Sequence, residues 1–142
     1  MPISYKFNPV SQRVFTTVTG EVTAREVIDH FETVRREGFL AYSELIDASS
    51  IVDPTLSVAE LWNVAVTMRK LQSQGSFGSR AVWVGSDMNF VLAHMFASLI
   101  SSFIRMRVFH DRLTAEEWLS KQNRRNLVPF NSGDSSSRIG NR

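Results

Sequence analysis

The residues most capable of chemistry gather in one polar loop that follows an apolar stretch of the chain. The carboxylate and hydroxyl side chains there are Asp47, Ser49, Ser50, Asp53 and Thr55. Side chains of this kind hydrogen-bond loop backbone in Asx- and Ser-type turns, and they also form polar rims around sites for proteins or small ligands. Two carboxylates without supporting ligands are weak evidence for a metal site, so we expect no bound metal here.

Ser57 comes directly after this loop and has two compatible roles. Together with Glu60 it forms the Ser-x-x-Glu pattern of a capping box, in which the serine hydroxyl caps a helix that begins here. The same hydroxyl is a possible phosphoacceptor. A phosphate at a helix N-terminus is favoured by the helix dipole and would change the charge of a binding surface.

A second polar pair, Ser86 and Asp87, follows the apolar run Arg80–Val84. Capping of the next helix explains both residues, and the exposed amides of such a turn offer an alternative site for an anion. Gly85 alone is not a Gly-rich phosphate loop. We expect this turn to form a second loop of the surface that carries Ser57.

The three histidines do not form a catalytic constellation in the sequence. His30 is expected on the solvent side of a helix, and His94 is expected to be a hydrogen-bonded core or interface residue. His110 precedes Asp111, but no Gly-x-Ser-x-Gly elbow supplies a nucleophile. The chain has no cysteine, which excludes thiolate chemistry. We therefore expect a non-enzymatic protein without a cofactor.

A regular alternation of strands and helices must position these residues. Alternating, β-branched or continuous apolar runs predict strands over residues 3–7, 13–19, 39–48, 80–84 and 106–110. Capping boxes predict helix starts at Thr23, Ser57 and Thr114, and the turn at Ser86 predicts a further helix. The order β-β-α-β-α-β-α-β-α predicts an α/β fold: a mixed, mostly parallel sheet of about five strands with helices packed on it.

The helix expected over Met88–Phe103 is apolar nearly all round, which exceeds the needs of one buried face. We expect it to be sandwiched between the sheet and another helix. Alternatively, its outer face, with Met88, Met95 and Phe96, forms a homodimer interface or an apolar ligand pocket.

Length and charge restrict the partners. At 142 residues the chain fits one domain, which we expect over residues 1–121, followed by a disordered, basic, polar tail over 122–142. The chain has 16 basic and 14 acidic residues. Five of the basic residues and one of the acidic residues lie at position 121 or later, so 11 basic and 13 acidic residues lie before it. The domain therefore has no basic footprint for nucleic acid. No apolar run reaches the ~20 residues that span a bilayer, and the N-terminus lacks a signal-peptide pattern, so we expect a cytoplasmic protein.

Several short segments resemble the SpoIIAA-like family of small bacterial proteins, which share the STAS fold of anti-sigma factor antagonists. The segments are Val14–Thr23, Leu45–Asp47, Val82–Gly85, Val108–His110 and Ala115–Leu119. The similarity spans roughly residues 3–120. These motifs are short and mostly structural, so they indicate a fold more than an activity.

The resemblance implies a regulatory module that binds a protein partner, such as an anti-sigma factor or a kinase. Such antagonists carry an Asp-Ser-Ser/Thr-Gly type motif whose serine is phosphorylated. Ser57 falls at or within one residue of that serine, but Leu56 and Val58 replace the neighbouring Asp and Gly, so the motif is degenerate. The alternative is a domain that binds a small molecule or lipid in an apolar pocket near residues 88–103, by analogy with the related architecture of Sec14-type lipid carriers.

Overall fold

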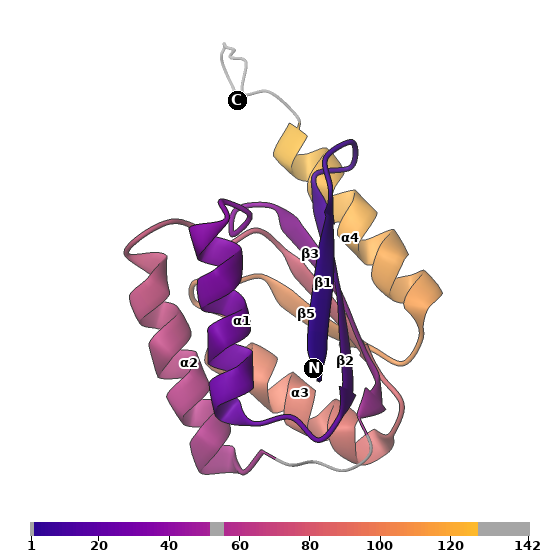
Figure 1. The fold of residues 1–142 in the computed structure, drawn as a ribbon. Coiled ribbons are helices and arrows are strands. Elements are labelled where there is room, and N and C mark those ends of the chain that lie inside the picture. The colour runs from indigo at the N-terminus through magenta and orange to yellow at the C-terminus, as the bar shows by residue number, and fades with distance from the viewer. Residues whose placement is uncertain (1, 52–55, 128–142) are drawn as a thin grey trace.

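The chain folds into one five-stranded sheet with helices on both faces (Figure 1). The computed structural model describes residues 2–51 and 56–127, and side chains as far as Gln122. The elements in chain order are β1 (Ile3–Asn8), β2 (Arg13–Gly20), α1 (Ala24–Arg36), β3 (Ser43–Ile51), α2 (Val58–Gln72), β4 (Arg80–Val84), α3 (Asp87–Leu99), β5 (Met106–Phe109) and α4 (Arg112–Leu127). This order confirms the predicted α/β fold.

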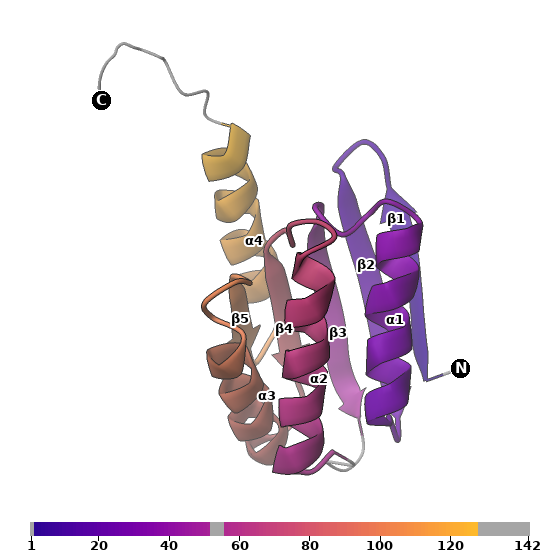
Figure 2. The same ribbon diagram turned by 90° about the vertical axis from the view of Figure 1, so that its left-hand side faces the viewer.

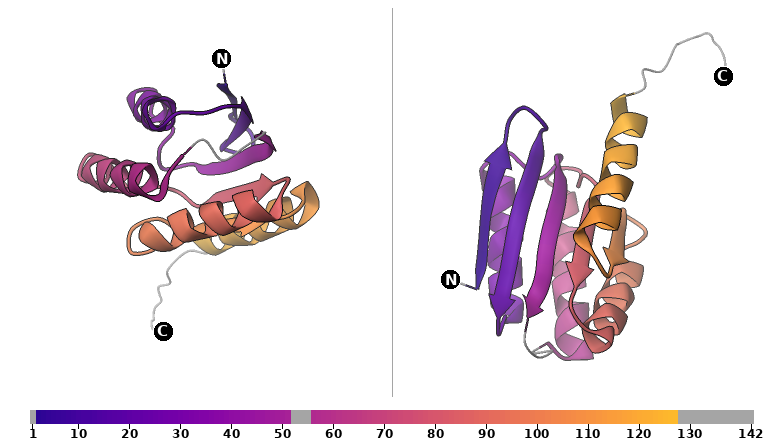
Figure 3. Two further views of the ribbon diagram at one scale, coloured as in Figure 1. Left: turned by 90° about the horizontal axis from the view of Figure 1, so that it is seen from below. Right: turned by 90° about the vertical axis from the view of Figure 1, so that its right-hand side faces the viewer.

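The strands lie in the sheet in their sequence order, β1-β2-β3-β4-β5. β1 and β2 form an antiparallel hairpin, and β2 to β5 run parallel. Every step between parallel strands goes in the same direction across the sheet. Right-handed crossovers therefore place α1, α2 and α3 on one face. No further described strand follows β5, and α4 packs on the opposite face (Figures 2 and 3).

Alternation along the central strands divides the core into two parts. On the face of the three helices, Ile46 and Val82 pack with residues that include Ala97 of α3. On the face of α4, Leu45 and Ala81 pack against Leu119 and its neighbours. A strand that is buried on both faces needs apolar residues at successive positions, and this explains the continuous apolar run of β4.

Two of the three predicted capping boxes are confirmed. The hydroxyls of Thr23 and Ser57 each accept the backbone N–H three residues on, and the glutamate at that position accepts the cap's own N–H. The prediction that Thr114 begins a helix was wrong, because α4 begins at Arg112. The carboxylate of Asp111 accepts the Thr114 N–H at 2.9 Å, so the cap lies three residues earlier.

Several other boundaries differ from prediction, and β3 begins at Ser43 rather than at residue 39. α3 ends at Leu99 rather than Phe103, since the chain turns there and buries both Ile100 and Ile104. The predicted disordered tail over 122–142 was wrong for residues 122–127, which belong to α4. Gln122 is buried and accepts a hydrogen bond from Arg105 Nη1 at 2.7 Å, and this contact holds the last turns of α4 to the domain. Residues 128–142 lie outside the described residues.

Candidate functional site: an apolar cavity beside a buried polar cluster

An apolar cavity of about 180 Å³ lies between the sheet and the three helices α1, α2 and α3. Its apolar lining from the sheet includes Val18, Ile46, Ala48, Val82 and Val84. Its apolar lining from the helices includes Phe31, Leu61, Val64, Leu92, Ala93 and Phe96. An apolar cavity of ~150 Å³ in another protein stays dry and admits a benzene-sized molecule, so this volume suits a small cyclic ligand.

Short side chains leave this space open in an otherwise close-packed layer. Ala48 on β3 and Ala93 on α3 both line the cavity, where a larger residue would fill it. The cavity extends to Ile51, the last residue of β3, and to Leu56, which precedes α2. Open α/β sheets bind their ligands at this end of their parallel strands.

Three polar residues, Thr16, His30 and Asn89, complete the lining. They come from β2, α1 and α3, so each layer around the cavity contributes to it. The side-chain amide of Asn89 donates to the carbonyl of Ile51 at 3.3 Å. Thr16 and His30 both contact a carboxylate behind the cavity wall, that of Glu44 on β3.

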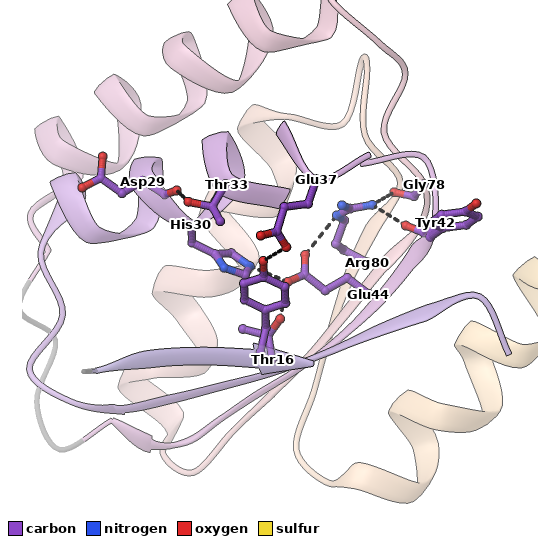
Figure 4. A network of polar contacts seen from close by, with 10 residues as sticks. Thr16, Asp29, His30, Thr33, Glu37, Tyr42, Glu44, Gly78 and Arg80 are labelled. Atoms are coloured by element: carbon purple, nitrogen blue, oxygen red, sulfur yellow. Dashed lines mark hydrogen bonds and ion pairs between the residues drawn. The ribbon is translucent and has the colours of Figure 1, made fainter. Parts of the chain in front are cut away.

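The carboxylate of Glu44 is the centre of a buried polar cluster (Figure 4). Its Oε2 atom accepts a hydrogen bond from the hydroxyl of Thr16 at 2.5 Å and lies 2.7 Å from Nε2 of His30. Its Oε1 atom lies 3.2 Å from Nε of Arg80. The Glu44 side chain is 0% exposed and the Arg80 side chain 1%, so this ion pair is sealed from water.

The partners of Glu44 keep its carboxylate ionised. Burial by itself raises the pKa of Glu44. The hydrogen bond from His30, the positive charges of His30 and Arg80, and the hydrogen bond from Thr16 outweigh burial and lower the pKa to about 2. Since an ionised carboxylate only accepts hydrogen bonds, the protons in both short contacts belong to Thr16 Oγ1 and His30 Nε2.

Arg80 is fixed by backbone as well as by Glu44. Its Nη1 atom donates to the carbonyls of Tyr42 and Gly78, at 3.0 and 2.7 Å. Its guanidinium carbon lies 5.3 Å from the centre of the Phe77 ring. These contacts hold the guanidinium in one position, so the positive charge stays beside Glu44.

The ring of His30 is held by aromatic neighbours. Tyr5 and Phe31 meet it edge to face, with ring centres 5.5 and 5.2 Å away. The Tyr5 hydroxyl donates to the carboxylate of Glu37 at the end of α1. Burial, followed by this hydrogen bond and the nearby charge of Glu37, raises the pKa of Tyr5 to about 12. These ring contacts therefore hold the His30 side chain in one position.

The expectation that His30 lies on the solvent side was wrong, because the side chain is buried. Residue 30 follows Val27 by three positions and precedes Val34 by four, which places it on the inward face of α1. This spacing was readable in the sequence. Glu44 and Arg80 were missed for another reason: the sequence places charged residues at the starts of two buried strands but does not show that these strands are neighbours.

Of the predicted loop residues that the structure describes, Asp47, Ser49 and Ser50 do not line the cavity. Asp47 follows Leu45 in the alternation of β3 and lies on the face opposite Ile46. Its carboxylate accepts from the N–H and hydroxyl of Ser49 at 3.0 and 2.6 Å, an Asx-type turn. The prediction of a loop from residue 49 was wrong for Ser49 and Ser50, since β3 continues to Ile51 and exposes both serines.

Asp53 and Thr55 lie outside the described residues. Ser57 is exposed and caps α2. Ser86 caps α3 by accepting the Asn89 N–H at 3.1 Å, and the exposed Asp87 is the first residue of that helix. Both predicted polar turns therefore cap helices.

The three residues expected on the outer face of α3 differ in their exposure to solvent. Met88 is exposed, Met95 is partly buried, and Phe96 is buried in the core and lines the cavity. The prediction of a core position for His94 was wrong, because its side chain is exposed beside Phe90, whose ring centre is 6.1 Å away. The ring of His110 stacks on Phe90 instead, at 4.1 Å.

Among the described residues, no group of three or more carboxylate or histidine side chains could hold a metal ion. None of the helices in that part of the chain is long and apolar enough to cross a membrane. Comparisons with protein-family models, with curated proteins and with solved structures give no match. The structure therefore establishes an α/β fold with a mixed five-stranded sheet, and the comparisons add no family to it.

Proposed function

We propose that this domain binds a small, mostly apolar molecule in the cavity between the sheet and α1, α2 and α3. The observation that carries the proposal is the cavity itself, with an apolar lining and three polar side chains. Ligand sites commonly combine a largely apolar wall with a few placed polar groups. A structural core of the same layers would fill the space with larger residues at Ala48 or Ala93.

The volume of the cavity accommodates a single ring or a short branched chain. About 180 Å³ is slightly more than the ~150 Å³ that admits benzene elsewhere. A long acyl chain needs more space than that. A small cyclic compound is therefore a better candidate than a membrane lipid.

Saturation-transfer NMR with toluene and cyclohexane tests this proposal. Both compounds should receive magnetisation from the wild-type protein. The Ala93→Leu variant, which places an isopropyl group in the cavity, should remove the effect. Val91→Leu adds bulk to an exposed position of the same helix and should leave it intact. Equal effects in all three proteins would mean surface binding and would refute the proposal.

A second candidate function is a regulatory module that binds a protein partner, as the resemblance to SpoIIAA-like proteins suggests. It is favoured by an exposed apolar stripe on α2. Val58, Trp62 and Val66 are spaced four residues apart, and their exposed fractions are 57%, 57% and 41%. The stripe starts beside Ser57, so phosphorylation there would place charge next to the apolar contact.

Quantitative capture from a bacterial lysate tests the second function. A specific partner should bind the wild type and be lost with Trp62→Lys, while Val91→Lys on α3 retains it. Ser57→Glu should change the amount captured if this residue is a switch, and incubation with kinase should add a phosphate mass at Ser57. Identical capture by the wild type and Trp62→Lys would exclude α2 as the partner surface.

A further inference from the structure

We propose that two copies of this chain form a symmetric dimer through the outer surface of α2 and α3. The dimer gives the apolar stripe of α2 (Val58, Trp62 and Val66) one occupant, a second copy of the chain, in place of a different protein. It does not depend on the ligand of the cavity. Two features of this surface lead to it: the position of its exposed apolar side chains and the arrangement of the charges around them.

Exposed apolar side chains concentrate on these two helices. In the part of the chain that the structure describes, five of the seven exposed large apolar side chains lie on α2 or α3. Those on α3 are Met88 and Val91, which are 61% and 63% exposed. The other two, Val10 and Leu113, lie apart in the hairpin turn and on α4. Scattered apolar side chains are normal on a protein surface, whereas a concentration of them marks an interaction site.

The stripe of α2 lies on the side of that helix that borders α3. Arg69 follows Val58 by eleven positions and Trp62 by seven, so all three project from the same side of the helix. Arg69 Nη1 donates to the Ser102 hydroxyl at 3.2 Å, and the guanidinium carbon lies 5.5 Å from the centre of the Phe103 ring. Both of these partners come shortly after α3 in the chain, so the stripe faces towards α3.

Met88 lies on the matching side of α3. It precedes Leu92 by four positions and Met95 by seven, so the three share one side of the helix. Leu92 and Met95 pack against a core cluster in which five of the nine buried residues come from α2. The exposed apolar side chains of the two helices therefore border one seam. In Figure 2, α2 lies in front of the sheet with none of the described elements over it.

Charged side chains lie at the two ends of this helical layer. Because α1, α2 and α3 each follow a parallel strand, all three begin at one edge of the sheet and end at the other. Acidic residues occupy all three first turns, and basic residues the last turns of α1 and α2: Glu26, Glu60 and Asp87, then Arg35, Arg36, Arg69 and Lys70. These charges complement the helix dipoles. They also make the layer acidic at one end and basic at the other.

A surface with this arrangement is complementary to itself. A two-fold axis through the seam turns the second copy end for end, so the acidic end of each copy meets the basic end of the other. A partner with charge of one sign, such as an anionic membrane, would match only one end. Homodimer interfaces are enriched in Trp and Met at the centre and depleted of charge there. Trp62 and Met88 meet that description.

Sedimentation velocity over a range of protein concentrations tests the dimer. The wild type should reach twice the mass of one chain as its concentration rises. Trp62→Lys should stay a monomer at every concentration, and its exposed position should tolerate the change. Leu113→Lys makes a similar change on α4, on the opposite face of the sheet, and should leave the dimer intact.

Charge reversal tests the end-for-end arrangement. At low salt, Lys70→Glu should raise the dissociation constant of the dimer about tenfold, since a two-fold axis makes each reversed charge act twice. Lys6→Glu makes the same change of charge at an exposed position of β1 and should have little effect. Asp87→Lys should also weaken the dimer. The double variant Lys70→Glu with Asp87→Lys should associate more tightly than either single variant.

A wild type that stays monomeric at all concentrations would overturn the dimer, and so would a Trp62→Lys variant that associates as tightly as the wild type. Equal effects of Lys70→Glu and Lys6→Glu would refute the end-for-end arrangement. If a monomeric wild type captures a different protein that Trp62→Lys loses, the stripe belongs to that protein instead. The cavity is tested separately by Ala93→Leu, so failure of the dimer leaves the proposed ligand binding intact.

Discussion

Replacing Glu44 with glutamine should change how the stability of the protein depends on pH. Glutamine keeps the size of the side chain and removes its charge. In the wild type the carboxylate is fully buried and is surrounded by Thr16, His30 and Arg80, three groups that stabilise its charged form. The stability that these contacts contribute is present only while Glu44 is ionised.

The pKa of Glu44 gives the size and the sign of the effect. The pKa falls from an ordinary 4.5 to about 2 on folding. At 1.36 kcal/mol per pKa unit, the ionised form gains about 3 kcal/mol of stability. Because the folded pKa is depressed, this contribution is complete above pH 4.5 and is lost as the pH falls towards 2. By about pH 3.5, about 1.4 kcal/mol of it has disappeared.

Glu44→Gln should also be less stable than the wild type near neutral pH. The substitution leaves the Arg80 guanidinium buried without its carboxylate, and breaking one side of a buried pair typically costs about 3–5 kcal/mol. Replacing both partners, as in Glu44→Gln with Arg80→Met, should recover part of this loss because no unpaired charge remains.

Urea unfolding monitored by tryptophan fluorescence measures these differences, since Trp83 is buried in the core. The stability gap between wild type and Glu44→Gln should be largest at about pH 7 and smaller by about 1.4 kcal/mol at about pH 3.5. Glu21→Gln removes an exposed carboxylate and controls for net charge. A gap that stays the same at both pH values would refute the assignment of a depressed pKa to Glu44.

Two further predictions concern packing. Gly78→Ala should lower the unfolding free energy by about 1–3 kcal/mol in a urea titration, because a Cβ there would lie 2.4 Å from the backbone oxygen of Tyr42; an unchanged midpoint would contradict this close approach. Leu119→Ala should cost about 2–5 kcal/mol by leaving a cavity under α4. The exposed Leu113 on the same helix provides the control, and equal losses at the two positions in thermal unfolding would argue against a core below α4.

Local chemistry explains why so much of the fold could be predicted. The caps at Thr23 and Ser57 depend on residues three positions apart, so the sequence contains the whole interaction. The apolar run of Arg80–Val84 likewise needs only burial on two faces. The start of α4 was misplaced because Thr114 and Asp111 both offer a capping oxygen, and sequence alone does not show which one the helix uses.

The candidate site was less predictable because it depends on contacts between distant segments. Glu44, His30 and Thr16 come from three elements, and only the register of β2 and β3 together with the packing of α1 brings them together. A cavity is harder still to predict, since it results from small residues such as Ala93 that read as ordinary helix formers. The apolar surplus of α3 suggested an interface or a pocket on the outer face of that helix, whereas the cavity lies on its inner side, where the buried Phe96 lines it.

The position of α4 has a consequence for how the chain is made. β1 to β5 add to the sheet in the order in which a ribosome releases them, and α1 to α3 cover one face as they appear. The other face, with Leu45 and Trp83, is covered by Leu119 and its neighbours on α4, the last described element. A nascent chain therefore presents a complete sheet with one bare apolar face until α4 emerges, and during that interval aggregation competes with folding.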